Sequence, residues 1–239
     1  MIKRAKDLRV KIFADGADKN GILEMYKKDY IKGFTTNPTL MRKAGISDYK
    51  KFALEILDII KDRPFSFEVF ADDFPNMERQ ALEINKWGKN VYVKIPVTNT
   101  NKESCCTLMK SLSKKGVKLN ITAMMTLQQT KDVAEATKEC PSCFVSIFAG
   151  RVADTAIDPV PMMKQALEIL KPYKNQELLW ASPRELLNIY QADEIGCHII
   201  TVTNDVLKKL DLVGKNLDEY SLETVKMFYT DAEKSGYKL

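Results

Sequence analysis

Residues 91–98 read VYVKIPVT, an apolar run that contains a single lysine, Lys94. Valine, isoleucine and tyrosine favour extended backbone, so this run predicts a buried β-strand. Lysine is rarely fully buried without a partner or a function. A lysine shielded from water loses its charge more easily and then acts as a nucleophilic amine that forms a Schiff base with a ketone. The alternative is that Lys94 lies at the edge of the strand, with its ammonium in solvent or paired with a carboxylate.

The sequence on both sides of this run alternates between short apolar runs and longer amphipathic segments. The predicted strands span residues 10–14, 31–34, 65–70, 91–98, 117–122, 144–148, 178–181 and 198–202. The predicted helices lie near residues 22–26, 38–60, 76–87, up to 115, 127–134, 160–170, 184–192 and 204–210. Strictly alternating strands and helices require a parallel sheet, and eight such units in this length predict an α/β fold of the closed (β/α)8 TIM type.

The domain organisation follows from the same alternation. We predict that residues 1–239 form a single barrel domain, in which residues 216–239 are a C-terminal helical extension. This extension is amphipathic, so it is expected to pack on the barrel or against another subunit of a homo-oligomer. Neither GxGxxG nor GxxxxGK[ST] follows any predicted strand, which argues against the nucleotide-binding folds.

Composition excludes several classes of protein. The chain has 239 residues, of which 45% are hydrophobic and 29% charged, and its formal net charge is +5. No segment approaches the ~18 apolar residues of a membrane span, and the charged N-terminus leads to no secretory core, so we expect a cytoplasmic protein with no membrane partner. Basic and acidic residues are interspersed, which argues against nucleic acid as a partner.

The chain contains five cysteines, an odd number that fits a reducing compartment. Cys140 and Cys143 form a CxxC motif, but no second CxxC accompanies it, and we expect packing or surface thiols there rather than a redox or zinc site. His198 is the single histidine, and we expect it to be structural.

Polar residues occur where the predicted strands end. In a barrel the carboxyl ends of all eight strands meet at one mouth, which is where the active sites of such enzymes lie. Burying a polar group costs roughly 1–3 kcal/mol unless the group is paired, so one shared site explains these residues better than separate, unrelated causes would. The set comprises Asp15, Thr36, Asn37, Glu68, Lys94, Asn120, Thr122, Ser146, Arg151, Ser182, Arg184, Thr201, Thr203 and Asn204.

Seven motifs carry most of these residues. They are FADGAD at 13–18, TTNPTL at 35–40, SFEV at 66–69, VKI at 93–95, NIT at 120–122, SIFAGR at 146–151 and ASPR at 181–184. In this order and spacing they resemble the transaldolase family over residues ~10 to ~205 of the chain. The TTNP block and the lysine of the fourth strand are the most specific of them. The resemblance implies an enzyme that forms a lysine Schiff base and needs neither metal nor organic cofactor.

The resemblance also implies the catalytic roles. Lys94 matches the Schiff-base lysine, whose imine takes up electrons when the bond between the third and fourth carbons of a ketose phosphate breaks. Asp15 matches the acid/base that removes the proton of the C4 hydroxyl. Glu68 and Thr122 match the pair that holds a water for the proton transfers of imine formation and hydrolysis.

The remaining matched positions imply substrate contacts. Asn37 and Ser146 match residues that hydrogen-bond the dihydroxyacetone moiety, and Thr36 and Phe148 belong to the same expected binding site. A second group, Arg151, Ser182 and Arg184, matches the phosphate clamp, because guanidinium groups fit a phosphate dianion in both geometry and charge.

Each of these residues also has a plain structural alternative. Asp15 and Asn37 could cap the helices that follow them, and Ser182 could cap the helix after Pro183. Arg151 and Arg184 could be ordinary surface charges.

The chain departs from the family pattern in informative ways. Its length is closer to that of the small subgroup, which includes fructose-6-phosphate aldolases that release free dihydroxyacetone. By the resemblance, those aldolases carry glutamine in place of Glu68 and tyrosine in place of Phe148, so both residues here are of the transaldolase type. Pro183 stands where the family often has an aromatic residue, and it makes the loop that carries Arg184 stiffer.

The resemblance therefore implies a transaldolase, a transferase of aldehyde or ketone groups acting on sugar phosphates in the pentose phosphate pathway. The expected donors are fructose 6-phosphate or sedoheptulose 7-phosphate, and the acceptor is an aldose phosphate. One alternative is an aldolase-type lyase that releases dihydroxyacetone. An alternative of another class is a non-catalytic sugar-phosphate binding barrel.

Overall fold

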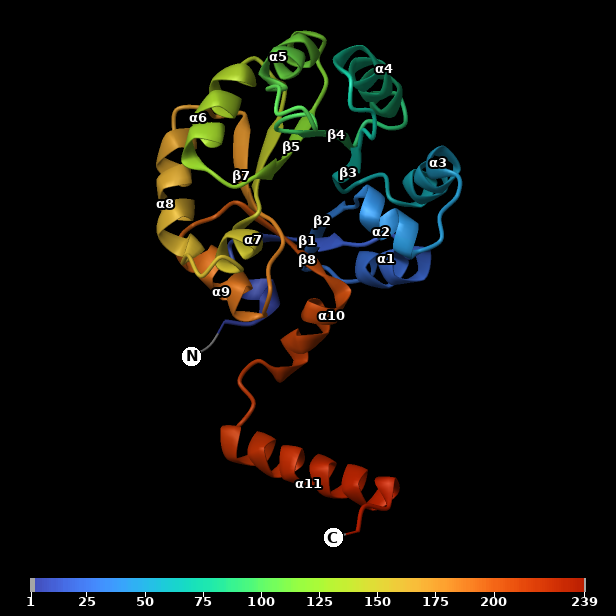
Figure 1. The fold of residues 1–239 in the computed structure, drawn as a ribbon, viewed down its shortest axis with the longest axis vertical. Helices are drawn as coiled ribbons and strands as arrows, with labels where there is room; N and C mark the ends of the chain where they lie inside the picture. Colours follow the sequence, from blue (N-terminus) through green and yellow to red (C-terminus); the bar gives the residue numbers. More distant parts are fainter. Residues whose placement is uncertain (1–2, 239) are drawn as a thin grey trace.

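A computed structural model describes residues 3–238 of the chain. Eight parallel strands pair in sequence order, and β8 closes onto β1 to complete a barrel (Figure 1). The closed (β/α)8 architecture predicted from the alternating sequence is thereby confirmed. The strands are β1 (Lys11–Asp15), β2 (Ile31–Thr35), β3 (Phe65–Glu68), β4 (Val91–Pro96), β5 (Leu119–Met124), β6 (Cys143–Ile147), β7 (Gln176–Trp180) and β8 (Ile199–Thr203).

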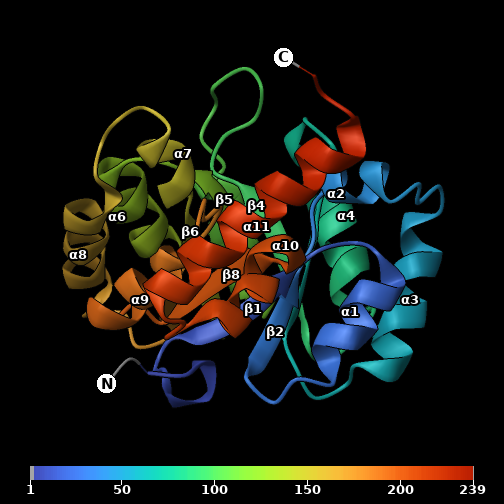
Figure 2. The same ribbon diagram turned by 90° about the horizontal axis from the view of Figure 1, so that it is seen from below.

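Helices cover the outside of this barrel. Figure 2 shows α1, α3 and α4 on one side of the strands and α6, α8 and α9 on the other. Several begin at side-chain caps, such as Asp48 and Asp73, whose carboxylates accept hydrogen bonds from first-turn amides. The helices after the strands are α1 (Lys19–Tyr26), α3 (Tyr49–Ile59), α4 (Phe74–Asn85), α5 (Cys106–Lys114), α6 (Leu127–Ala136), α8 (Pro159–Leu170), α9 (Leu187–Glu194) and α10 (Asn204–Leu207).

Further short elements were not separated in the prediction. A distinct α2 (Pro38–Lys43) precedes α3, and α7 (Ala149–Ala153) follows β6 directly. Two 3-10 helices span Ala5–Asp7 and Lys208–Leu212. The predicted start of α9 at Arg184 is wrong by three residues, because the Asn188 side chain accepts the amides of Arg184 and Glu185 and holds that segment as a loop.

The barrel interior is filled by side chains that alternate along the strands. Phe13 and Phe144 meet edge to face with ring centroids 5.6 Å apart, and Tyr92 stacks on Phe144 at 4.0 Å. Leu179 and Ile199 complete this inner cluster. Because the interior is packed closed below, the polar residues higher on the strands are left at the mouth.

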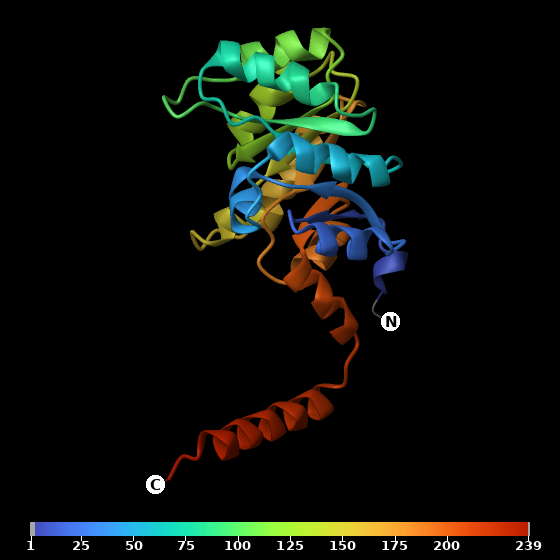
Figure 3. The same ribbon diagram turned by 90° about the vertical axis from the view of Figure 1, so that its right-hand side faces the viewer.

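The last helix, α11 (Leu217–Ser235), departs from the barrel after a short linker (Figures 1 and 3). None of its residues is buried. Between residues 3 and 238, no helix has the length and apolar character needed to cross a membrane.

Candidate active site

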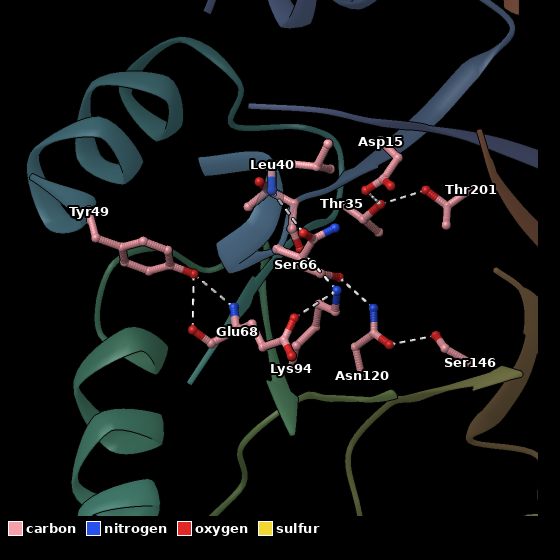
Figure 4. A network of polar contacts seen from close by, with 12 residues as sticks. Asp15, Thr35, Leu40, Tyr49, Ser66, Glu68, Lys94, Asn120, Ser146 and Thr201 are labelled. Atoms are coloured by element: carbon pink, nitrogen blue, oxygen red, sulfur yellow. Dashed lines mark hydrogen bonds and ion pairs between the residues drawn. The ribbon is translucent and has the colours of Figure 1, made fainter. Parts of the chain in front are cut away.

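Lys94 lies in the middle of β4, flanked in register by Glu68 of β3 and Asn120 of β5. Its side chain is buried, at 6% exposure for the residue, and it points into the barrel mouth (Figure 4). The ammonium nitrogen Nζ donates to the carbonyl oxygen of Thr36 at 2.9 Å and lies 3.1 Å from Oε2 of Glu68. The lysine is therefore buried and at the same time paired with a carboxylate.

This pairing gives the lysine a proton acceptor. Oε2 of Glu68 lies 3.1 Å from Nζ, within reach of a direct proton transfer that would free the amine as a nucleophile.

Asp15 ends β1 and lines the cavity at the same mouth. The hydroxyl of Thr35 donates to Oδ1 of Asp15 at 2.6 Å, and the Thr35 hydroxyl lies 2.5 Å from that of Thr201 on β8. Burial raises the pKa of Asp15, and the nearby charge of Lys94 opposes that rise without cancelling it. The cap of α1 is Asp18 and not Asp15, so the structural alternative for Asp15 is wrong.

A chain of hydrogen bonds crosses the floor of the mouth. The Ser146 hydroxyl donates to Oδ1 of Asn120 at 2.6 Å, and Nδ2 of Asn120 donates to the Ser66 hydroxyl at 2.9 Å. All three side chains are buried and lie on adjacent or next-neighbouring strands. Ser66 and Asn120 were present in the motifs but had no predicted role, because sequence does not show which strands face each other.

The backbone of β5 bulges next to Thr122. The register between β5 and β6 shifts between Ile121 and Met124, and Ala123 adopts a left-handed conformation with φ of 62°. Asn120 and Thr122 are two residues apart, so the alternation of the strand already places both at the mouth, and the extra residue follows them.

A cavity of about 310 Å³ occupies the mouth, within the range of small-molecule sites. Most of the residues predicted for the site line it: Asp15, Asn37, Lys94, Thr122, Ser146, Phe148, Arg151, Ser182 and Arg184. Asn120, Thr201 and Thr203 of the predicted set also line it, whereas Glu68, Thr36 and Asn204 do not. Glu68 pairs with Lys94, and Thr36 is fully buried and presents its carbonyl oxygen to Lys94.

Asn37 combines two roles. Its Oδ1 accepts the amide of Leu40 at 3.0 Å and caps α2, as the structural alternative proposed. The cap fixes the side chain while the residue still lines the cavity, so its amino group remains a donor for a ligand.

Basic residues lie at one end of the cavity, on α7 and on the loop after β7. Arg151 lies over the ring of Phe148, with 5.3 Å from guanidinium carbon to ring centroid. Arg184 forms a two-point ion pair with Asp154, whose Nε–Oδ1 distance is 3.0 Å. Ser182 has a positive φ of 59°, and its carbonyl lies so close to Gly150 that a Cβ there would stand 1.5 Å from it. The loop is thus fixed by backbone contact, and Pro183 lines the cavity beside Arg184.

Residues left outside the site have other partners. Nδ1 of His198 accepts the amide of Leu178 at 3.0 Å, which agrees with a structural histidine. Cys140 and Cys143 are buried where β6 begins, at the opposite end of the barrel from the mouth. Within residues 3–238, no three His, Cys, Asp or Glu side chains gather as metal ligands would.

The chain is thus a (β/α)8 barrel of the enzyme type, with a buried lysine paired with a carboxylate at its mouth and arginines at one end of the cavity. The model of the family described as Transaldolase/Fructose-6-phosphate aldolase matches residues 12–239. The chain belongs to this family.

Curated relatives agree with the family. The chain is 36% identical over 202 residues to a probable transaldolase of Dehalococcoides mccartyi, which covers 84% of this chain and 90% of the relative. It is 34% identical over 231 residues to a probable transaldolase of Thermoanaerobacter sp., which covers 96% and 100%.

Solved structures at low identity share only the fold. One, the crystal structure of KGPDC from Streptococcus mutans, has a TM-score of 0.58 at 8% identity over 84% of this chain and 90% of that chain. A putative lyase/mutase from Burkholderia cenocepacia has a TM-score of 0.58 at 10% identity over 95% and 84%.

Proposed function

We propose that this enzyme is a transaldolase that moves a dihydroxyacetone unit from a ketose phosphate to an aldose phosphate through a Schiff base on Lys94. The observation that carries the proposal is the placement of Lys94 between Glu68 and the cavity that Asp15 and the arginines line. The donors are fructose 6-phosphate or sedoheptulose 7-phosphate, as in the pentose phosphate pathway.

The first half of the reaction forms and uses an imine. Glu68, with its Oε2 3.1 Å from Nζ, takes a proton from Lys94, and the free amine adds to the C2 carbonyl of the donor. Loss of water gives the imine. Asp15 then removes the proton of the C4 hydroxyl, the bond between C3 and C4 breaks, and its electron pair moves toward the imine nitrogen to give an enamine. The aldose phosphate leaves.

The second half reverses these steps on a new aldehyde. The enamine carbon attacks the acceptor carbonyl, and Asp15 returns its proton to the new hydroxyl. Water then hydrolyses the imine and releases the product from Lys94. A carboxyl with a raised pKa suits Asp15 for this work, because it gives up and takes back a proton nearer to neutral pH than an exposed aspartate does.

The binding residues support a donor held by its two ends. Asn37 and Ser146 line the cavity beside Lys94, where the dihydroxyacetone part would lie. Arg151 and Arg184 line it together with Ser182, where they would hold the phosphate. For Arg184 to reach the phosphate, its ion pair with Asp154 has to open or be shared.

The choice between transferase and aldolase rests on Phe148. Its ring lines the cavity and offers no hydroxyl that could help a water reach the enamine, so the bound three-carbon unit waits for an acceptor. Assays with fructose 6-phosphate with and without erythrose 4-phosphate test this. We expect turnover that depends on the acceptor, and we expect Phe148→Tyr to raise the release of dihydroxyacetone without acceptor. Equal rates with and without acceptor would make the enzyme an aldolase.

A non-catalytic sugar-phosphate binding barrel would behave differently. Such a protein would bind fructose 6-phosphate and leave no adduct that borohydride can trap.

A further inference from the structure

Strands β2 and β3 separate just where Lys94 enters the mouth. Their ladder includes the bonds from the Phe34 amide to the Pro64 carbonyl at 2.8 Å and from the Thr36 amide to the Ser66 carbonyl at 3.3 Å. The alternation of a parallel ladder places the next bond between the Glu68 amide and the Thr36 carbonyl. Both groups instead have other partners.

The two replacements lie on opposite sides of the strands. The Thr36 carbonyl accepts Nζ of Lys94 at 2.9 Å from the mouth side. The hydroxyl of Tyr49 accepts the Glu68 amide at 2.9 Å and donates to the Glu68 carbonyl at 3.0 Å from the helical side (Figure 4). One phenol therefore satisfies both backbone groups of the residue that pairs with Lys94.

The ring of Tyr49 is held by its surroundings. Tyr49 is the first residue of α3, directly after the cap Asp48. Its ring packs at 6.2 Å from that of Phe67, 5.7 Å from that of Phe70 and 5.8 Å from that of Trp87. Burial raises the pKa of Tyr49, so the hydroxyl keeps its proton and remains a donor throughout the working range of pH.

We propose that Tyr49 is a positioning residue that takes the place of the missing β2–β3 hydrogen bond. In doing so it keeps the Thr36 carbonyl free for Lys94 and fixes the Glu68 carboxylate against the amine. This inference rests on the proposed Schiff-base function of Lys94, but no atom of Tyr49 touches the substrate cavity.

Loss of the hydroxyl has a definite structural consequence. In Tyr49→Phe the Glu68 amide loses its acceptor, and a buried amide without a partner is unfavourable. The acceptor that would then complete the β2–β3 ladder for this amide is the Thr36 carbonyl. Closing this bond would draw β2 and β3 together, compete with Lys94 for its acceptor and shift the Glu68 carboxylate.

The test compares Tyr49→Phe with Tyr26→Phe. Tyr26 is a matched control, because its hydroxyl donates to Asp62 at 2.8 Å on the outer surface and its ring packs near Phe34 of β2. We expect Tyr49→Phe to lower kcat by about 10- to 100-fold, the range that a misplacement of ~1 Å produces. KM for fructose 6-phosphate should change less than about 2-fold, because the arginines are untouched, and Tyr26→Phe should resemble the wild type.

A double-mutant cycle with Glu68→Gln then separates positioning from general stability. Rates are divided by the folded fraction from denaturation curves, so partial unfolding does not imitate a catalytic loss. If Tyr49 acts through Glu68, Tyr49→Phe has little further effect on kcat in the Glu68→Gln protein. Additive losses would overturn the action through the Glu68 carboxylate. An unchanged kcat, or a loss that vanishes after this correction, would overturn the inference as a whole.

The proposed function has its own control in the same experiment. Wild-type protein that gives no adduct on Lys94 with fructose 6-phosphate and borohydride would refute the Schiff base itself. An adduct in the wild type with no change in Tyr49→Phe would refute only the role of Tyr49.

Discussion

At the scale of residues, the site holds charged side chains that are largely shielded from solvent. Lys94 and Glu68 are stabilised by each other, and Asp15 is held by a hydroxyl and by the more distant charge of Lys94. Such groups usually lower stability, because removing a charge from water costs more than one partner restores. We therefore expect these proposed catalytic residues to lower the stability of the protein.

Asp15→Asn tests this at one position. The pKa of Asp15 is raised in the folded protein, so the folded state binds its proton more tightly than the unfolded state does. The contribution of protonated Asp15 to the free energy of unfolding is fully present below the ordinary pKa of aspartate, near 4. It is lost as the pH rises through the pKa of Asp15 in the folded protein. Asparagine keeps the acceptor for Thr35 and has no such dependence.

We expect Asp15→Asn to melt at a higher temperature than the wild type at about pH 7.5, with a smaller difference at about pH 4. Its kcat should fall by roughly 10²- to 10⁴-fold. Thermal denaturation at both pH values checks the first claim and steady-state kinetics the second. A variant less stable than the wild type at neutral pH would contradict the account.

The sequence was informative about residues inside strands and less so about their partners. Lys94, Glu68 and Asp15 stand out because charges are rare in apolar strands. Thr35, Ser66 and Tyr49 do not, because hydroxyls are common in every element and their importance comes from what lies opposite. That depends on strand register, which one sequence does not give.

At the scale of elements, short connections place the arginines. α7 starts directly after β6, and its first turn rests on the loop after β7 through the contact of Gly150 with Ser182. The sequence predicted β6 and β7 to within two residues, but it did not separate α7 or α2. Each is one or two turns long, too short to show the periodicity by which helices are recognised.

Gly150→Ala should disturb this contact. The added Cβ would stand 1.5 Å from a backbone oxygen, which no side-chain rotation relieves, so the loop that carries Ser182 and Arg184 has to move. We expect a loss of about 1–3 kcal/mol in the free energy of unfolding. We also expect a rise in KM for fructose 6-phosphate of about 10-fold, as for a weakened bond to a charged group.

Gly16→Ala is the matched control, since no atom lies within 4 Å of the position of its Cβ. Denaturation curves and steady-state kinetics measure both variants. An unchanged KM in Gly150→Ala, together with normal stability, would mean that the loop does not need this close approach.

At the scale of the whole molecule, the barrel was predictable and the placement of α11 was not. Eight strands that alternate with helices of regular length strongly favour a closed parallel sheet. A terminal amphipathic helix has no such constraint, and the sequence left two destinations open. In the structure α11 carries large exposed apolar side chains, among them Phe228 at 64% exposure, with Leu217, Tyr220, Leu222, Val225, Met227 and Tyr229.

We predict that a second copy of the chain covers this face. α11 holds five acidic and two basic side chains, whereas the chain as a whole has a net charge of +5, so the helix complements the basic remainder of another copy. Light scattering during gel filtration should find an oligomer for the full chain and a monomer for a chain that ends at Val213. Val225→Ser with Phe228→Ser should weaken assembly, while Lys226→Gln should not.

A monomeric full-length chain would contradict this prediction, as would a truncated chain that assembles equally well. A monomer whose α11 amides are protected from hydrogen exchange would mean that the helix folds back on its own barrel.

The central claim is that Lys94 carries the reaction as an imine, and borohydride trapping measures it most directly. The protein is incubated with fructose 6-phosphate and sodium borohydride, digested, and mapped by mass spectrometry. Lys94→Arg serves as the control, because arginine keeps the positive charge beside Glu68 but does not deprotonate to form an imine. The account predicts a reduced adduct on the peptide that contains Lys94 and no adduct or turnover in Lys94→Arg. An adduct on another lysine, or normal turnover by Lys94→Arg, would contradict it.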